Sequence, residues 1–253
     1  MRVRTLSTFL GSLTILASAA TPALATTTGG APAESTTPAI TTTAGATTPA
    51  TAIHLSPITA KSPRITYKGP IYQKTATGEV IPYQPPSTSG PLTTATGGSP
   101  VGVTADTKPE LLVPGSLARY VNGLAAAPMS APAVVQEVIW AGNQIIGLPY
   151  IFGGGHASFD SPGYDCSGTV SFALHGASLL ATPEDSSEFM VWGSHGAGRW
   201  ISVFGNSGHA YMDVAGLRLD TSSADDPSNQ QGPRWRPLRP ENEGFTVRHP
   251  LGL

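Results

Sequence analysis

The chain contains a single cysteine, Cys166, and its position in the sequence suggests that its thiol is reactive. Asp165 precedes it and is a good N-cap, so the pattern predicts that a helix begins at Cys166. The free N–H groups and positive dipole end of a helix start stabilise a thiolate, and the same groups can donate to an oxyanion. A free cysteine is more commonly buried and inert. We nevertheless expect Cys166 to act as a nucleophile, with His209 as its base.

The predicted base stands at the start of a hairpin whose register follows from the sequence. If Ala215–Gly216 forms a two-residue turn, Val214 pairs with Leu217. One face of the hairpin is then apolar, and the opposite face is polar. The polar face carries His209, Tyr211, Asp213, Arg218, Asp220 and Ser222, and it is the candidate site.

Two carboxylates on the polar face compete to orient the imidazole. Asp220 lies diagonal to His209, within reach of a hydrogen bond that would fix the ring tautomer and stabilise its cation. Asp213 lies directly opposite Arg218 and is expected to pair with it instead. We therefore predict a triad of Cys166, His209 and Asp220, and keep Asp213 as the alternative third member.

The remaining histidines are weaker candidates. His156 follows three glycines in a loop beside the predicted site and is expected to line it, as is Tyr211. The sequence has no H-E-x-x-H motif and no second cysteine, and no Lys-Ser/Thr ending follows Gly153–Gly155. We therefore expect no metal, no cofactor and no phosphate-binding loop.

Two helices and a small sheet must position these residues. The first helix is expected between a Ser130 cap and a Gly147 stop, and the second from Cys166 toward Pro183. Strands are expected at residues 200–204, 209–214, 217–222 and 245–248, with a hairpin at 118–126 around Asn122-Gly123. Helices followed by a small antiparallel sheet predict the α+β class.

The first part of the chain has a different character. Residues 1–25 resemble a secretory signal peptide, because Arg2 and Arg4 precede an apolar stretch and a small-residue cleavage pattern. Residues 26–110 are rich in Thr, Ala, Pro and Gly, which predicts a largely disordered linker whose later part adds short extended patches. The ordered catalytic domain is expected at residues 111–253. The formal net charge of -2 argues against nucleic acid as a partner.

Three motifs together resemble the NlpC/P60 cysteine peptidases. They are Gly147-Leu148-Pro149-Tyr150-Ile151-Phe152-Gly153-Gly154, then Asp165-Cys166-Ser167-Gly168, and then Gly208-His209 at the start of a strand. The resemblance covers about the last half of the chain. It implies a papain-like α+β fold and hydrolysis of peptidoglycan stem peptides, commonly between D-γ-glutamate and a diamino acid.

The same resemblance implies roles for individual residues. Cys166 is the nucleophile, His209 the base, and Asp220 fills the third polar position, where His, Asn or Gln is more familiar. Tyr150 helps to form the oxyanion site, and Asp165 and Ser167 match positions that hold substrate. The expected partner is peptidoglycan or its peptide fragments, met by a monomer in the wall, periplasm or exterior of a bacterium, without stable membrane insertion after signal removal.

Two alternatives stay open at this point. An amidase or acyltransferase could use the same triad on another acyl bond. A catalytically silent wall-binding module could keep the fold without turnover.

Overall fold

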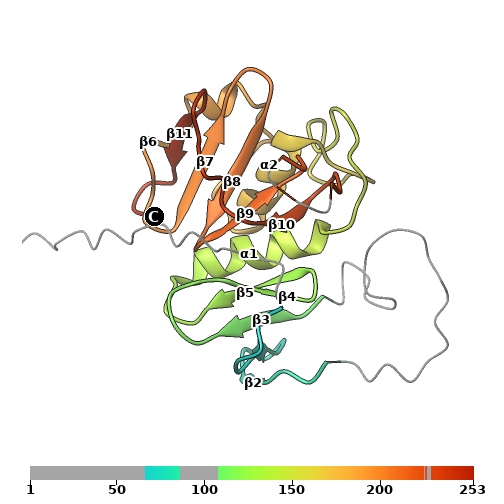
Figure 1. The fold of residues 1–253 in the computed structure, drawn as a ribbon, viewed down its shortest axis with the longest axis vertical. Coiled ribbons are helices and arrows are strands. Elements are labelled where there is room, and N and C mark those ends of the chain that lie inside the picture. Colours follow the sequence, from blue (N-terminus) through green and yellow to red (C-terminus); the bar gives the residue numbers. More distant parts are fainter. Residues whose placement is uncertain (1–65, 86–107, 225, 227–228) are drawn as a thin grey trace, which may run out of the picture. The chain divides into compact units, whose positions relative to one another are not determined.

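The computed structural model describes residues 66–85, 108–224, 226 and 229–253 (Figure 1). The predicted signal peptide and most of the predicted linker lie outside these residues. All of the described residues belong to one compact unit, residues 52–253. It has the α+β architecture, with two α-helices and two sheets that are mainly antiparallel.

The first sheet has the strand order β2-β1-β3-β5-β4. Its strands are β1 (Tyr72–Lys74), β2 (Val80–Pro82), β3 (Glu110–Val113), β4 (Arg119–Val121) and β5 (Leu124–Pro128). Only the pairing of β3 with β5 is parallel. The predicted β4–β5 hairpin is confirmed, because Val121 pairs with Leu124 and both turn residues, Asn122 and Gly123, have positive φ.

The first sheet corrects the predicted start of the ordered domain at Leu111. β1 and β2 come from the segment assigned to the linker, and β1 pairs with β3, which itself begins at Glu110. The aromatic residues Tyr67, Tyr72 and Tyr83 pack against the hydrophobic core. The sparse apolar side chains of residues 66–85 therefore suffice for a hairpin because an existing strand edge accepts it.

Two helices follow. α1 (Ala133–Ile145) buries Val135, Val138 and Ile139, as the apolar pattern predicts. The expected cap at Ser130 is wrong, since the N-cap is Pro132 and the Ser130 hydroxyl donates to the carbonyl of Gly115. α2 (Cys166–Gly176) begins at the predicted residue, with Asp165 as its N-cap.

The second sheet has the order β10-β9-β8-β7-β11-β6. Its strands are β6 (Ser194–His195), β7 (Ile201–Gly205), β8 (Ala210–Val214), β9 (Leu217–Asp220), β10 (Arg234–Arg236) and β11 (Thr246–His249), and a short 3₁₀ helix, η2 (Glu188–Met190), precedes β6. The predicted hairpin register is confirmed, because Val214 pairs with Leu217 and Asp213 with Arg218. The sequence pattern did not reveal β6 or β10.

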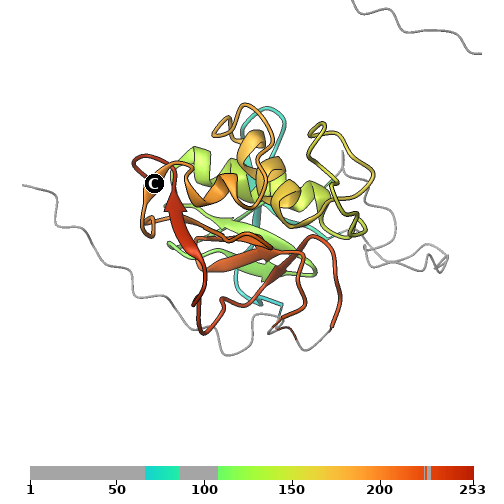
Figure 2. The same ribbon diagram turned by 90° about the horizontal axis from the view of Figure 1, so that it is seen from above.

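The α1 helix lies between the two sheets, and α2 packs on β8 and β9 of the second sheet (Figure 1). Figure 2 shows both helices on the same side of the strands of the second sheet. The inner residues of those strands, among them Val203, Met212 and Leu219, are fully buried with the helices. The opposite face of the second sheet therefore carries its polar side chains, as the alternation predicts.

One buried amide joins three of these elements. Asn143 of α1 is 1% exposed, and its Nδ2 donates to the Ala125 carbonyl of β5 at 2.8 Å. Its Oδ1 accepts from the backbone N–H of Ala125 at 2.9 Å and from Nε1 of Trp235 in β10 at 2.8 Å. Asn143 thus links the first sheet, α1 and the second sheet through one side chain.

In the described part of the chain, no helix is long and apolar enough to cross a membrane.

Replacing Asn143 with leucine is expected to destabilise the fold. The change leaves the N–H and carbonyl of Ala125 and the indole N–H of Trp235 buried without their partner. We expect a loss of roughly 3 kcal/mol in the free energy of unfolding, measured by urea denaturation. The exposed neighbour Gln144→Leu is the control and should change stability little; equal stability of the two variants would contradict the linking role.

Candidate active site

The thiol of Cys166 occupies the first turn of α2, and the residue is partly exposed. The Asp165 side chain accepts from the backbone N–H of Gly168 at 2.8 Å, so the cap is formed by the predicted residue. The remaining N–H groups of the first turn have no partner within the helix. The thiol therefore lies where a helix start can stabilise negative charge.

The start of α2 packs closely against the loop that carries Gly153–Gly155, here called the glycine loop. A Cβ on Gly168 would lie 2.0 Å from the carbonyl oxygen of Gly154. Gly154 is equally confined, because a Cβ there would meet the carbonyl oxygen of Gly163 at 2.3 Å. These two glycines allow the backbone of the loop to lie directly against the residues that follow Cys166.

His209 lies immediately before β8, at the end of a turn fixed by Asn206. The Asn206 Oδ1 accepts from the backbone N–H groups of Gly208 and His209, both at 2.9 Å. The imidazole Nε2 lies 2.9 Å from Asp220 Oδ1, which is the predicted partner. Because Nε2 is bonded to Asp220, Nδ1 is the ring nitrogen that can form a hydrogen bond with the thiol of Cys166.

Cys166 and His209 shift each other's titration. Burial raises the pKa of Cys166, but hydrogen bonds from His209 and from the backbone of Ala210, together with the charge of His209, outweigh burial and lower it. Burial lowers the pKa of His209, but its bonds to Asp220 and Cys166 and their charges raise it to about 9. The two shifts have opposite signs, as expected for a thiolate and an imidazolium held together.

Tyr150 stands beside this pair at the edge of the glycine loop. Burial raises the pKa of its hydroxyl, and the nearby charges of Cys166 and Asp165 raise it further. The phenol is therefore kept protonated and able to donate a hydrogen bond. Tyr150 is still 42% exposed, so part of it is open to solvent.

Asp165 and Ser167, predicted to hold substrate, are buried instead. They are 4% and 2% exposed, and both lie within hydrogen-bond distance of His156 Nε2, at 3.0 Å. The other carboxylate oxygen of Asp165 accepts from the N–H of Gly153 at 2.9 Å. Because Asp165 bonds both Gly153 and Gly168, it ties the glycine loop to the start of α2. His156 takes part in these contacts through Nε2, and its side chain remains 35% exposed.

Tyr211, expected to line the site, is wholly buried behind it. Its ring stacks on Phe204 at 4.7 Å, and its hydroxyl donates to Asn242 Oδ1 at 2.7 Å. Its centroid lies 6.1 Å from that of His209. Tyr211 therefore supports the imidazole and does not face a ligand.

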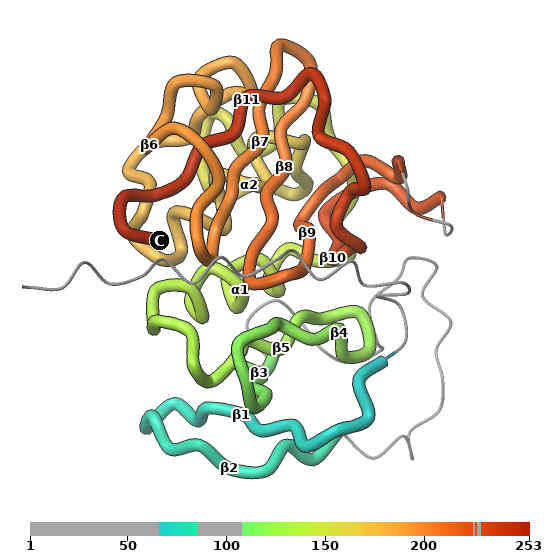
Figure 3. The backbone as a smooth tube through the Cα atoms, turned by 60° about the vertical axis from the view of Figure 1, so that its left-hand side comes forward, coloured from blue at the N-terminus to red at the C-terminus, as the bar shows by residue number. Residues whose placement is uncertain are grey.

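The segment 237–245 covers the polar face of the second sheet and was not predicted to take part in the site. Figure 3 follows it in dark red from β10 past β8 toward β11. Phe245 packs edge-on against the rings of His209 and Tyr211. Its ring centroid lies 6.3 Å from that of His209 and 5.0 Å from that of Tyr211. The guanidinium of Arg239 lies over the Tyr211 ring at 5.1 Å. No sequence pattern signalled these contacts, because they join residues far apart in the chain.

Behind Asp220 lies a group of buried charges. The Arg218 guanidinium is 0% exposed, and its Nη1 lies 3.6 Å from Asp220 Oδ2. Across the hairpin, burial raises the pKa of Asp213 to about 7, although the charges of Arg218 and Arg239 act to lower it. In the described structure, Asp213 Oδ1 is buried without a hydrogen-bond partner. Asp213 thus does not compete for His209, whose hydrogen bond goes to Asp220.

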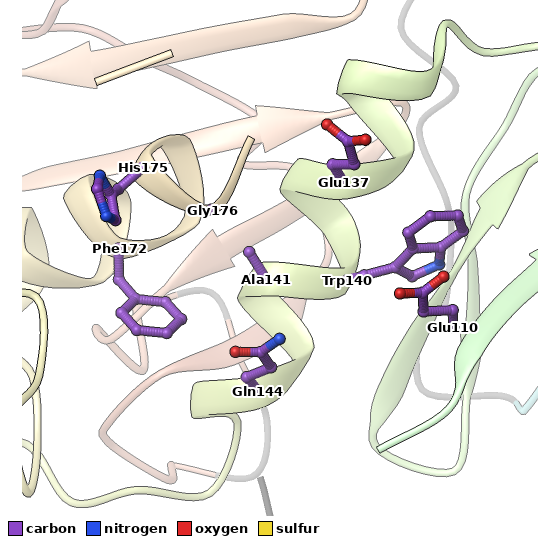
Figure 4. Close-up of a pocket in the computed structure, with 8 residues that line it drawn as sticks. All are labelled: Glu110, Glu137, Trp140, Ala141, Gln144, Phe172, His175 and Gly176. Atoms are coloured by element: carbon purple, nitrogen blue, oxygen red, sulfur yellow. The ribbon is translucent and has the colours of Figure 1, made fainter. Parts of the chain in front are cut away.

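Two hollows lie outside the triad. One, of about 280 Å³, opens between α1, α2 and β3 and is lined by Glu137, Trp140, Phe172 and His175 among others (Figure 4). The second, of about 560 Å³, lies beside β11 and includes Phe204, Asn242 and Phe245. Neither is lined by Cys166, His209 or Asp220. Within the described ranges, no group of three or more His, Cys, Asp or Glu side chains could hold a metal ion.

The arrangement defines a helix-start thiol paired with an imidazole and a buried carboxylate. No family model matches the chain, and no curated protein matches it in sequence.

The pH dependence of Cys166 alkylation tests the paired state. We expect iodoacetamide to react with a midpoint below that of a free thiol, ~8.5, because His209 lowers the pKa of Cys166. In His209→Ala the contributions of the imidazole vanish, while burial and the hydrogen bond from the backbone of Ala210 remain, so the midpoint should rise toward the free-thiol value. Mass spectrometry of alkylated protein measures the rate at each pH.

The exposed His195→Ala is the matched control for that experiment and should keep the wild-type profile. An unchanged profile in His209→Ala would show that the imidazole does not act on the sulfur.

Asp213 predicts a second pH effect, this time on stability. Its folded-state pKa of about 7 lies above the ordinary value of 3.8, so the folded protein retains a proton that the unfolded chain has lost. Stability should fall as pH rises from about 4 to 7, by up to about 4 kcal/mol. Asp213→Asn should therefore be more stable than wild type at pH 8 and similar at pH 4.

Urea denaturation of Asp213→Asn at the two pH values measures this difference. Asp160→Asn, which removes an exposed loop carboxylate, serves as the control and should behave like wild type. A stability gain that is the same at both pH values would contradict a buried titrating carboxyl.

Proposed function

We propose that the protein is a cysteine peptidase with a papain-like, NlpC/P60-type fold that hydrolyses peptide bonds in peptidoglycan stem peptides. The observation that carries the proposal is the contact of a helix-start thiol with an imidazole that is itself bonded to Asp220. A structural cysteine would need neither the lowered pKa nor an oriented histidine. The order and spacing of the Pro-Tyr-x-x-Gly-Gly, Asp-Cys-Ser-Gly and Gly-His motifs supply the family and substrate class.

The first half-reaction follows from these groups. The thiolate of Cys166 attacks the carbonyl carbon of the scissile amide, and a carbon–sulfur bond forms as the carbonyl oxygen becomes an oxyanion. Backbone N–H groups at the start of α2 and the Tyr150 hydroxyl would stabilise that oxyanion. When the carbon–nitrogen bond breaks, the imidazolium of His209 protonates the leaving amine, and a thioester remains on Cys166.

The second half-reaction returns the enzyme to its starting state. The neutral imidazole takes a proton from water, and the resulting hydroxide attacks the thioester carbonyl. The carboxylic acid product leaves, and Cys166 departs as the thiolate beside a newly protonated His209. Asp220 holds the ring in one orientation through both steps and stabilises its cationic form.

The opening for such a substrate would lie beside the glycine loop. Tyr150, Ile151 and Phe152 are exposed there, and Phe152 is 90% exposed. An export signal at residues 1–25 would deliver the protein to the compartment that holds peptidoglycan.

The experiment incubates the purified protein with muropeptides that carry D-γ-glutamyl-diamino acid bonds and analyses the products by mass spectrometry. We expect cleavage at that bond and none by Cys166→Ala. Asp220→Asn should lower the rate by roughly 10 to 100-fold, because an amide orients the ring without stabilising its charge. Asp160→Asn should retain the wild-type rate.

The cleavage rate should also fall above pH 9, where His209 loses the proton that the leaving amine requires.

Release of the intact stem peptide from the glycan would instead identify an amidase. Transfer of the acyl group to an added amine would identify an acyltransferase. If Cys166 alkylates as an activated thiol but no muropeptide is cleaved, the assigned substrate is wrong. Equal wall binding by wild type and Cys166→Ala, with an unactivated thiol, would indicate a binding module.

A further inference from the structure

Arg218 is a wholly buried cation directly behind the carboxylate that bonds His209. Both Arg218 and Asp220 have side chains that are 0% exposed, and Nη1 of Arg218 lies 3.6 Å from Asp220 Oδ2. The other carboxylate oxygen, Oδ1, is bonded by His209 Nε2 and by the backbone N–H of Ser222, both at 2.9 Å. Asp220 therefore lies between an arginine on one side and the imidazole on the other.

The surroundings of Arg218 contain several other charged or polar groups. Asp213 lies opposite it in the hairpin, and the Tyr211 ring lies 5.9 Å from its guanidinium carbon. Nη2 of Arg218 donates to the carbonyl of Ala224, a residue shortly after Asp220 in the chain, at 2.7 Å. Arg236, which is paired with Asp226, also lies within electrostatic range of Asp220 and Arg218.

Burial penalises the ionised form of any carboxyl unless an opposite charge compensates. Asp220 is 1% exposed, and the nearby Asp213 would add further repulsion whenever it ionises. An ionised Asp220 is what stabilises an imidazolium at His209. The ion pair with Arg218 supplies that compensation from the side of Asp220 facing away from the imidazole.

We propose that Arg218 is a positioning residue of the active site: by pairing with Asp220 it compensates the charge of that buried carboxylate and holds it aimed at His209, and so maintains the reactive thiolate of Cys166. The role in catalysis rests on the proposed function. The electrostatic relay itself, from Arg218 through Asp220 and His209 to the sulfur, can be measured without any substrate.

The first test compares the pH profile of Cys166 alkylation in wild type, Arg218→Met and Arg218→Lys. In Arg218→Met the iodoacetamide rate at pH 7 should fall about ten-fold, equivalent to a rise of about one pH unit in the midpoint. Arg218→Lys retains a cation, so its alkylation rate at pH 7 should lie between those of wild type and Arg218→Met. Arg248→Met removes a partly buried arginine of β11 that bonds Met190, and should keep the wild-type profile.

A second test covers the case in which Arg218→Met does not fold. In the Asp220→Asn background the buried carboxylate is already neutral, so the fold no longer needs the compensating cation. If Arg218 acts through Asp220, Asp220→Asn and Asp220→Asn/Arg218→Met should show the same alkylation midpoint within about 0.3 pH units.

Two results would overturn the proposal. One is a folded Arg218→Met protein with the wild-type alkylation profile. The other is a further shift of about one pH unit when Arg218→Met is added to Asp220→Asn, which would mean that Arg218 acts on the thiol by another route. Because these readouts need no muropeptide, a failure of the substrate assignment would leave them intact, and a failure of the relay would appear even if cleavage is observed.

Discussion

The candidate site depends on one interaction, the contact between a thiol at the start of α2 and an imidazole immediately before β8. Neither group would be reactive alone, because burial favours the neutral form of each. Together they favour the charged pair, and the hydrogen bond from His209 to Asp220 fixes the geometry. The packing of α2 on β8 and β9 keeps the ends of these elements together.

Each member of the site is fixed from behind by buried polar contacts. Asp165 caps α2 and also bonds the glycine loop and His156, so the position of the sulfur and the loop that carries Tyr150 are coupled. On the other side, the segment 237–245 covers the polar face of the sheet and presses Phe245 against His209. The site thus lies between the loop bonded by Asp165 and the covered face of the sheet.

The buried charges next to Asp220 explain how an aspartate can be the third member of the proposed triad. A buried carboxylate needs a compensating cation, and Arg218 is placed to provide it. Asp213, which is on the same face and closer in sequence to His209, is instead shifted toward its neutral form. The two aspartates of this hairpin therefore have different surroundings, because Asp220 has both the His209 imidazole at 2.9 Å and the Arg218 cation at 3.6 Å.

The sequence alone determined the local features: the helix start at Cys166, the cap at Asp165, the two-residue length of the turn at Ala215–Gly216, and with it the register that brings Asp220 to His209. These depend on neighbouring residues and on the period of two in a strand. It did not determine that residues 66–85 complete a sheet with β3, that Asp165 and Ser167 are buried, or that Phe245 and Arg239 cover Tyr211. Those outcomes arise from contacts between distant segments, where burial and pairing are decided only when the chain has folded, because no local pattern records which surface another segment will cover.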